Sequence, residues 1–363
     1  MTLRVALVGG PMYDHLYTLF DWSDVEMVVH ADHPTLNRRV AELMEAGERL
    51  DLIATHSKYA PSQALWLRPL DTLVDASELA PLAVDLCRFE GALLCVPRLI
   101  DVRIMWSHLP NPPDTWSALA ASNVVFGFSG RESGLFGTFF ELVVGSGGQL
   151  FTDDGRPCID SPEAVVAVEL LCQLAARAPD DLPDWHYDQV DAALLDGRVD
   201  AAGMWPGAWG AVWSRQIDTE CGSAATRTLE PFRYPAGSHR WVSYAGCHAW
   251  AIPTTCGDVP AATTLLNTLM SAPAHTLDAQ GGSVCAHVGA FAAVEHVNDT
   301  DRRRLDIITD TIEQAMITYP PHPRFPEVED IGWHAIHDAL CGQITPAAAV
   351  AQIQAAALTI LLE

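Results

Sequence analysis

The side chains best suited to chemistry in this sequence are hydrogen-bonding and aromatic groups that follow or interrupt apolar, strand-like segments. His56 and Lys58 come directly after one such segment, and Asp101 and Arg103 interrupt the long apolar run 91–106. A sugar or polyol needs planar hydrogen-bonding groups and an aromatic ring that packs on its C–H surface. Each buried hydrogen bond contributes about 1 kcal/mol, and more when one partner is charged. This combination is therefore typical of a binding site for a small polar solute.

We expect the ligand-binding side chains to come from loops that follow strands and from the segments that join two lobes. The candidates are Met12, Tyr13, His15, His56, Ser57, Lys58, Asp101, Arg103, Arg131, Glu132, Trp205, Trp209, Tyr244, Gly246, His248 and Arg324. Any single member could instead form a surface or hinge salt bridge, and Asp101 with Arg103 could simply order the hinge. Trp205 and Trp209, which proline and glycine flank, are interpreted as a ring platform for the ligand.

Basic side chains offer a second interpretation of the ligand. Arg98, Arg103, Arg131 and Lys58 would together suit an acidic or phosphorylated solute. The sequence does not show whether these four residues meet, so both classes of ligand stay open.

Catalytic motifs are scarce. The segment 127–131 lacks the second glycine of a nucleophile elbow. No phosphate-binding P-loop is present, and Gly9-Gly10 does not match the dinucleotide-binding fingerprint. Cys247 and His248 could act as a nucleophile and a base, but adjacent strand residues point to opposite faces. We expect no catalytic residue and no cofactor, and a binding protein is favoured over an enzyme.

Two histidine pairs could in principle bind a metal ion. His334 and His337 lie three residues apart on a predicted helix, with Asp338 beside them. Without a third ligand at a suitable spacing, a surface or hydrogen-bonded pair is the better interpretation. His30 and His33 are interpreted in the same way, as a helix-cap and loop pair, so no metal site is expected.

Composition limits the partners. The 363 residues carry a formal net charge of −25, and Lys58 is the only lysine. Phosphate binding needs clustered Lys and Arg, so neither nucleic acid nor an anionic membrane surface is expected as a partner. No run of 18 uninterrupted apolar residues is present, so membrane insertion is not expected either. The nine cysteines form no CxxC pair and are interpreted as buried free thiols, with disulfides as the alternative. We expect a monomer.

The elements that must position the candidate residues alternate between strands and helices in the first part of the chain. Strands are predicted at 3–8, 25–29 and 50–55. This alternation indicates a parallel sheet with right-handed crossovers. Ligands bind beyond the carboxyl ends of such strands, and that rule selects the loops 9–15, 30–33 and 55–59.

A second α/β lobe is predicted from about residue 105. It has a strand at 124–128 and a helix at 134–144, with Ser133 as its N-cap and its N-terminus facing the ligand. Further helices are predicted near 161–175, 187–195, 259–271, 301–317, 327–340 and 345–362. The glycine-containing strand 242–253 is interpreted as a crossing back to the first lobe.

Several segments match one known family in their order and spacing. They are 88–103, 113–119 with its Pro-Asp-Thr-Trp, 145–149 followed by 160–164, 197–207, 323–326 and 342–347. With these motifs the chain resembles the extracellular solute-binding proteins of ABC importers, in the sugar-binding cluster with the type II periplasmic-binding fold. The resemblance covers nearly the whole chain, although each motif is loose.

The resemblance implies a two-lobed α/β fold in which each lobe is a mainly parallel sheet flanked by helices. The N-terminal lobe would comprise 1–104 and 247–297, the C-terminal lobe 105–246 and 298–363, and the hinge would lie near 97–106 and 243–253. The implied function is the capture of a small polar, carbohydrate-like ligand between the lobes by hinge closure. ABC permease subunits would then be partners.

One feature departs from the family, whose importer-feeding members are exported. The sequence begins Met1-Thr2-Leu3-Arg4 and leads directly into a strand, without the pattern of a signal peptide. As it stands it predicts a cytoplasmic protein, or a periplasmic or extracellular one if a signal was removed. The alternative function is a cytosolic enzyme, sensor or carrier on the same fold that acts on a small polar or acidic metabolite.

Overall fold

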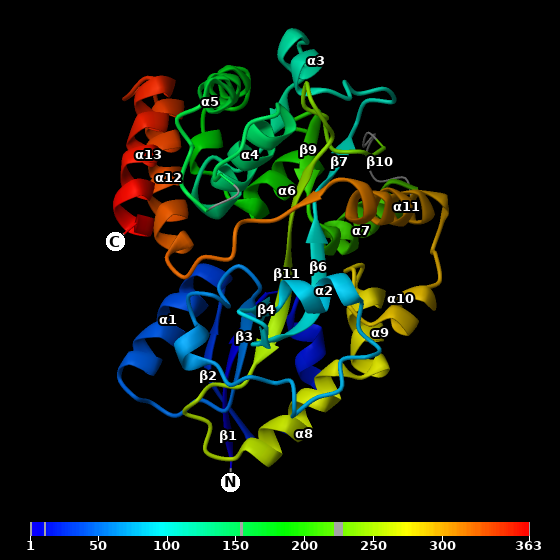
Figure 1. Ribbon diagram of the computed structural model, residues 1–363. Helices are drawn as coiled ribbons and strands as arrows, with labels where there is room; N and C mark the ends of the chain where they lie inside the picture. The colour runs from blue at the N-terminus through cyan, green and yellow to red at the C-terminus, as the bar shows by residue number, and fades with distance from the viewer. Residues whose placement is uncertain (1, 11, 153–154, 221–227, 363) are drawn as a thin grey trace. The chain divides into compact units, whose positions relative to one another are not determined.

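The chain forms two compact units in the computed structural model, which describes residues 2–10, 12–152, 155–220 and 228–362 (Figure 1). Unit 1 contains Met1–Asp101, Gly246–Glu295 and Pro321–Pro323. Unit 2 contains Val102–Ala245, His296–Pro320 and Arg324–Glu363. Each unit combines a β-sheet with helices, so the fold is mixed α/β, as the alternation of strands and helices predicts.

The sheet of unit 1 is built around three parallel strands. They are β1 (Leu3–Val8), β2 (Val25–Ala31) and β3 (Leu52–His56), and β1 pairs with both of the others. Strand β11 (Ser243–Ala251) runs antiparallel to β3, and β6 (Val96–Val102) pairs with β11. Val5, Leu7 and Ile53 are at most 1% exposed, so β1 and β3 form part of the core. Parallel pairing places the carboxyl ends of β1, β2 and β3 at one edge of the sheet.

Helices and short turns complete unit 1. They are η1 (Asp14–Leu19), α1 (His33–Glu45), η2 (Ala64–Trp66), α2 (Pro81–Leu86), α8 (Val259–Met270), α9 (Ala272–Gln280) and α10 (Val288–Ala292). A small hairpin pairs β4 (Arg88–Phe89) with β5 (Ala92–Leu93). Helix α1 begins immediately after β2 because the Asp32 carboxylate accepts a hydrogen bond from the backbone N–H of Thr35 at 2.8 Å.

The sheet of unit 2 differs from the mainly parallel sheet that was expected. Its strands are β7 (Ile104–Ser107), β8 (Phe126–Gly127), β9 (Ala201–Met204) and β10 (Glu230–Phe232), in the order β10-β7-β9-β8. Strand β7 is antiparallel to β9 and β10, and β8 is parallel to β9. The single residue Arg103 separates β6 from β7.

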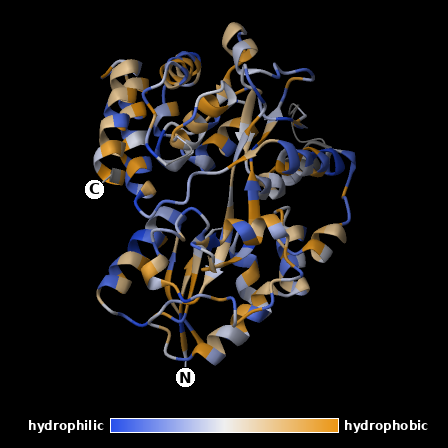
Figure 2. Cartoon of the chain, in the orientation of Figure 1, coloured by the Kyte–Doolittle hydropathy of each residue, from blue (hydrophilic) through white to orange (hydrophobic). Residues whose placement is uncertain are grey.

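Helices make up most of unit 2. They are α3 (Trp116–Ala121), α4 (Glu132–Gly145), α5 (Pro162–Ala175), η3 (Leu182–Asp184), α6 (Tyr187–Leu195), η4 (Pro206–Ala208), α7 (Trp209–Glu220), α11 (Asp299–Gln314), α12 (Phe325–Leu340) and α13 (Pro346–Leu362). The two-residue strand β12 (Met316–Ile317) pairs with the start of β11. Helix α11 is largely hydrophilic and α13 largely hydrophobic (Figure 2).

The first turn of α4 differs from its prediction. The helix begins at Glu132 with Arg131 at the cap position, so the assignment of Ser133 as N-cap is wrong. The Ser133 side chain lies inside the first turn, and its hydroxyl is 3.4 Å from that of Tyr187. Every α4 residue from Gly134 to Gly145 is buried, which makes this helix the centre of the unit 2 core.

The described part of the chain adds two findings on composition. Its eight cysteines are all free thiols, and Cys87, Cys95, Cys247 and Cys285 are buried. Among the helices that the structure describes, none combines the length and hydrophobicity needed to span a lipid bilayer.

Candidate ligand-binding site

Five side chains meet at the carboxyl-end edge of the unit 1 sheet, and we call this group the histidine edge. Its members are Tyr13, His33, His56, Asp101 and His248. Tyr13 lies in the turn after β1, His33 begins α1 after β2, and His56 ends β3. Asp101 and His248 come from the paired strands β6 and β11. The sheet therefore brings together segments that are far apart in the sequence, at the edge where the rule for parallel strands places a ligand.

His248 is the centre of the histidine edge. Its Nε2 lies 2.7 Å from Oδ2 of Asp101 and 3.3 Å from the hydroxyl of Tyr13. Its Nδ1 lies 2.6 Å from Nε2 of His33. The ring centroids of His56 and His248 are 5.3 Å apart, because the two residues oppose each other across the β3–β11 ladder. His248 is 9% exposed and Asp101 7%, so both groups depend on these contacts for their hydrogen bonds.

Two imidazoles of the histidine edge are neutral at pH 7. Burial, followed by the positive charges of His248 and Lys58, lowers the pKa of His33 and that of His56 well below the usual 6.5. Nδ1 of His56 accepts a hydrogen bond from the backbone N–H of Lys58 at 3.2 Å, so its Nε2 carries the proton. Nδ1 of His33 is buried and has no hydrogen-bond partner among the described residues. The edge therefore offers both donors and acceptors to a solute.

A buried ion pair supports the turn that carries Tyr13. Arg98 donates hydrogen bonds to the two carboxylate oxygens of Asp278, at 2.9 Å from Nε and 2.7 Å from Nη2. The same Nη2 donates to the backbone carbonyl of Tyr13 at 3.2 Å. Nε2 of His15 lies 2.9 Å from Oδ1 of Asp278. Because Asp278 neutralises its charge inside unit 1, Arg98 does not add a free cation for an acidic solute.

Ser57 and Gly246 lie next to His56, the first in the chain and the second in space. The Ser57 hydroxyl accepts a hydrogen bond from the backbone N–H of Cys247 at 3.1 Å, which ties the chain after β3 to β11. Gly246 leaves room for the imidazole, since a Cβ atom there would lie 2.1 Å from Cε1 of His56. Ser57 therefore links two backbone segments, whereas Gly246 leaves room for a neighbouring side chain.

Lys58 and Met12 flank this region. The Lys58 ammonium lies 4.8 Å from the centroid of the Tyr59 ring. Met12 is half-buried in the turn before η1, next to Tyr13 in the chain.

An aromatic cluster gathers in unit 2, and we call its four residues the tyrosine–tryptophan cluster. They are Tyr187, Trp205, Tyr244 and Tyr319. The half-buried ring of Trp205 lies 5.7 Å from Tyr187 and 6.1 Å from Tyr244, between ring centroids and in edge-to-face geometry. Tyr244 and Tyr319 are 4.5 Å apart. This packing fixes the orientation of Trp205.

Arg103 lies beneath this cluster in a buried ion pair. Its Nε donates to Oε1 of Glu141 at 3.2 Å, and its Nη2 also contacts Oε2 of Glu141. Its guanidinium lies 5.3 Å from the Trp205 ring centroid. The backbone N–H of Tyr244 donates to Oε1 of Glu141 at 2.7 Å. Arg103 therefore pairs with Glu141 and Asp101 pairs with His248, rather than with each other as the alternative interpretation allowed.

Trp209 belongs to a different group from Trp205. It is 6% exposed and stacks on Trp106 and on Trp213, with ring centroids 5.9 Å apart in both pairs. The Arg304 guanidinium lies 4.7 Å from its ring centroid. The structure thus places Trp209 in the interior of unit 2.

Arg131, Glu132 and Arg324 lie at helix starts in unit 2. Nη1 of Arg131 is 2.6 Å from Oε1 of Glu132, at the start of α4. Oε2 of Glu132 is also 3.5 Å from Nε2 of His186. Arg324 precedes α12, pairs with Glu327 at 2.9 Å and donates to the backbone carbonyl of Ile360 at 2.6 Å. Local ion pairs thus engage all three.

The sequence analysis did not include His33 and Asp278 among the site residues. His33 lies in one of the loops that the strand rule selected, but its role as a partner of His248 depends on a contact across the sheet. Asp278 lies on α9, and no local pattern links it to Arg98, which is 180 positions away. The interpretation of His30 and His33 as a helix-cap and loop pair is wrong, because His30 lies in β2 and contacts Asp14 at 2.8 Å, while Asp32 caps α1.

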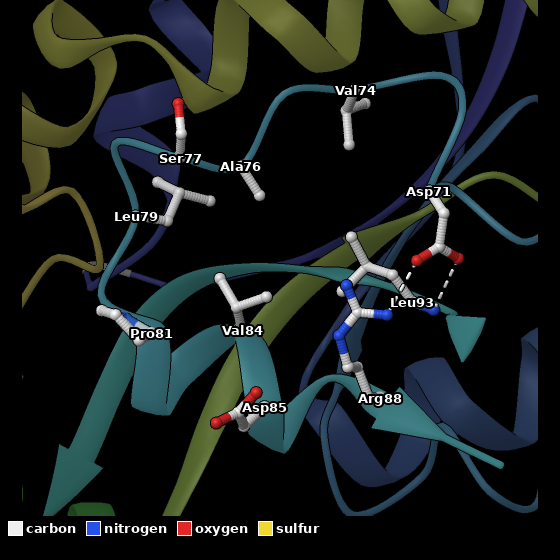
Figure 3. A pocket seen from close by; sticks show the side chains of 10 residues that line it. All are labelled: Asp71, Val74, Ala76, Ser77, Leu79, Pro81, Val84, Asp85, Arg88 and Leu93. Carbon is white, nitrogen blue, oxygen red and sulfur yellow. Dashed lines mark hydrogen bonds and ion pairs between the residues drawn. The ribbon is translucent and has the colours of Figure 1, made fainter. Parts of the chain in front are cut away.

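A surface pocket of about 410 Å³ lies elsewhere on unit 1 (Figure 3). It is lined by Asp71, Val74, Ala76, Ser77, Leu79, Pro81, Val84, Asp85, Arg88 and Leu93. The Asp71 carboxylate bonds to the Arg88 guanidinium at 2.7 Å and to the backbone N–H of Leu93 at 2.9 Å, as the dashed lines show. None of the predicted site residues lines this pocket, and Asp71 and Arg88 pair with each other in its wall.

Solved structures share this fold over nearly the full chain. The maltose-bound MalE3 protein of T. maritima is 19% identical, with a TM-score of 0.86, covering 99% of this chain and 100% of that one. A solute-binding protein of an ABC transporter from Thermotoga lettingae, bound to α-D-tagatose, is 19% identical with a TM-score of 0.85 and covers 99% of each chain. One from Agrobacterium radiobacter, in complex with ribitol, is 18% identical with a TM-score of 0.81, covering 99% of this chain and 98% of that one.

Sequence comparison identifies the family. No curated protein matches the sequence. A family model described as bacterial extracellular solute-binding protein matches residues 23–282, which is more than half of the chain. The chain therefore belongs to the bacterial extracellular solute-binding protein family.

Proposed function

We propose that this solute-binding protein captures a small polar, carbohydrate-like solute and that the histidine edge forms the unit 1 part of its binding site. The observation that carries the proposal is the convergence of phenol, imidazole and carboxylate groups from five separate segments at one sheet edge. A polyhydroxyl solute both donates and accepts hydrogen bonds along its length. The edge presents both kinds of partner within a few ångströms, on a rigid sheet.

The half-buried ring of Trp205 is the proposed aromatic platform of unit 2. Tyr187 and Tyr244 pack against the Trp205 ring in edge-to-face geometry and fix its orientation. The face of the indole is therefore pre-oriented for the C–H surface of a sugar. Maltose, tagatose and ribitol in the similar structures support a sugar or polyol as the solute class.

An acidic solute has less support from the charges. The guanidinium groups of Arg98 and Arg103 are each neutralised by a buried carboxylate of the same unit. Any net positive charge for such a solute would have to come from other residues.

We also propose that solute binding involves hinge closure and that the loaded protein delivers its solute to the permease subunits of an ABC importer. The matching family is described as extracellular, which supports a function of this protein outside the cytoplasm. Closure would be driven by a higher affinity of the solute for the closed state than for the open state.

Calorimetric titration with maltose, tagatose and ribitol, in the presence of EDTA, tests the proposed function. We expect one class of solute to bind at one site per chain, and a concentration of 100 Kd should stabilise the fold by about 2.7 kcal/mol. His56→Ala and Trp205→Ala should each weaken this binding, whereas His30→Gln, in an exposed histidine–carboxylate pair, should not. The absence of binding across a broad sugar and polyol panel would contradict the proposal, as would turnover of the solute seen by mass spectrometry.

A further inference from the structure

Three side chains of the histidine edge form a group suited to a metal ion. One nitrogen of His56, one nitrogen of His248 and one carboxylate oxygen of Asp101 all lie within 4.8 Å of one another. His56 and His248 oppose each other in the β3–β11 ladder, and Asp101 comes from β6, which pairs with β11. The three ligand atoms therefore project from paired strands rather than from loops, which keeps them in a common geometry.

The geometry points to a site for one divalent transition-metal ion of the zinc type, held by His56, Asp101 and His248. Two imidazoles and one carboxylate are a common set for such ions, and a fourth position stays open for water. Ligands about 2.0–2.2 Å from a tetrahedral zinc ion lie roughly 3.3–3.6 Å apart. The 2.7 Å contact between Asp101 and His248 needs only a small opening to reach that spacing.

The contacts around His248 are suited to coordination of the metal ion through its Nε2 atom. Asp101 and Tyr13 both face that nitrogen, whereas Nδ1 faces Nε2 of His33 at 2.6 Å. When a metal ion takes Nε2, the ring proton moves to Nδ1 and is donated to His33. Outer hydrogen bonds of this kind fix the tautomer and the ring orientation of metal-bound histidines. His33 is therefore the positioning residue of the site.

His56 needs one adjustment. Its Nδ1 accepts the 3.2 Å hydrogen bond from the backbone N–H of Lys58, so Nε2 is the nitrogen that can turn to the metal. Binding then transfers the ring proton from Nε2 to Nδ1 and gives up that bond. Two cations are near the edge, but Arg98 is neutralised by Asp278 and the Lys58 ammonium lies over the Tyr59 ring.

Zinc titration of the full chain, first stripped with EDTA and then dialysed free of it, tests this inference. Calorimetry with ZnCl₂ should show one ion per chain, and CoCl₂ should give the visible absorption of tetrahedral cobalt. His56→Ala, Asp101→Asn and His248→Ala should each weaken zinc binding by about 100-fold or more, and His33→Phe, which removes no ligand, by about 10–100-fold. His30→Gln is the matched control, because His30, in the parallel strand β2, also pairs with a carboxylate but belongs to no three-ligand group among the described residues.

Circular dichroism and metal-free unfolding of each variant show whether it is folded. No zinc binding by the wild-type chain, or equal zinc affinity in folded Asp101→Asn and wild-type proteins, would overturn the inference. The inference does not rest on the proposed function, because the probe is the metal alone. Sugar binding in EDTA without zinc binding refutes only the metal site, and zinc binding without sugar binding refutes only the sugar proposal.

Discussion

The Asp101 carboxylate lies 2.7 Å from Nε2 of His248, and this contact joins strands β6 and β11 at the histidine edge. The two residues are at most 9% exposed. A buried donor or acceptor that loses its partner destabilises its surroundings by about 1–3 kcal/mol. The contact therefore holds His248 in the orientation that also meets His33 at 2.6 Å.

Asp101→Asn should weaken solute binding while leaving the fold intact. The amide keeps the shape of the carboxylate but removes its charge, and hydrogen bonds to charged groups contribute about 1.5–3 kcal/mol, which corresponds to roughly 10-fold or more in Kd. Titration calorimetry in EDTA measures the change. Asp14→Asn, at the exposed partner of His30, is the control. Equal affinities of Asp101→Asn and wild type would show that this carboxylate has no part in solute binding.

Gly246→Ala should displace the His56 ring. A Cβ atom at Gly246 would lie 2.1 Å from Cε1 and 2.5 Å from Nε2 of His56, so the imidazole has to move. We expect a clear loss of solute affinity by calorimetry. Gly289→Ala in α10 is the control, since the nearest atom would be 3.4 Å from its Cβ. Unchanged binding in Gly246→Ala would mean that the position of His56 is unimportant for the solute.

Asp278→Asn should destabilise the protein at pH 7 and change its acid unfolding. Burial by itself raises the pKa of Asp278, but the hydrogen bonds and charge of Arg98, followed by those of His15, hold the pKa below its usual 3.8. The pair therefore stabilises the fold at a pH above 3.8, and this contribution is lost as the pH falls through the lower, folded-state pKa.

Asp278→Asn removes the negative charge of this buried pair and leaves the positive charge of Arg98 buried without a counter-charge. The free energy of unfolding should therefore fall by about 3–5 kcal/mol. Urea unfolding at pH 7 and at pH 3 checks both effects, and the difference between wild type and Asp278→Asn should shrink at pH 3. Asp21→Asn, at a fully exposed carboxylate, should leave the free energy of unfolding at pH 7 close to that of wild type. A pH-independent difference for Asp278→Asn would rule out the charged pair as the cause.

Trp209→Ala and Trp205→Ala should have different effects. Trp209 is 6% exposed in a stack of three indoles, so its truncation should lower the free energy of unfolding by about 3–5 kcal/mol. Trp205 is half-buried, so Trp205→Ala should destabilise less and act mainly on solute affinity. Urea unfolding and calorimetry on both variants provide the comparison. Greater loss of solute affinity in Trp209→Ala than in an equally folded Trp205→Ala would reverse the assignment.

Several parts of the fold and family could be predicted because their signals are local. Alternating apolar strands and amphipathic helices predict a parallel sheet, and β1, β2 and β3 form one. The order of loose motifs along the chain indicates the solute-binding family that sequence comparison identifies. Ser133 shows the limit of such reasoning, because a good capping residue is not the cap when the helix starts two residues earlier.

The side-chain partners at the candidate site depended on the tertiary structure. Arg98, Arg103 and Asp101 are three charges within six positions of sequence, and they pair with Asp278, Glu141 and His248. Each partner comes from another strand or helix, and a buried charge pairs with whatever carboxylate or imidazole the packing brings near.

The sequence by itself determined the mixed α/β class, the parallel strands of unit 1 and the loops at their carboxyl ends, because periodicity and turn residues act over a few neighbours. Only the tertiary structure decided that His33, His56 and His248 meet beside Asp101, that Trp209 is buried while Trp205 is half-exposed, and that the unit 2 sheet is mostly antiparallel. The reason is that strand order and register set distances between residues distant in the chain, and no local pattern encodes them.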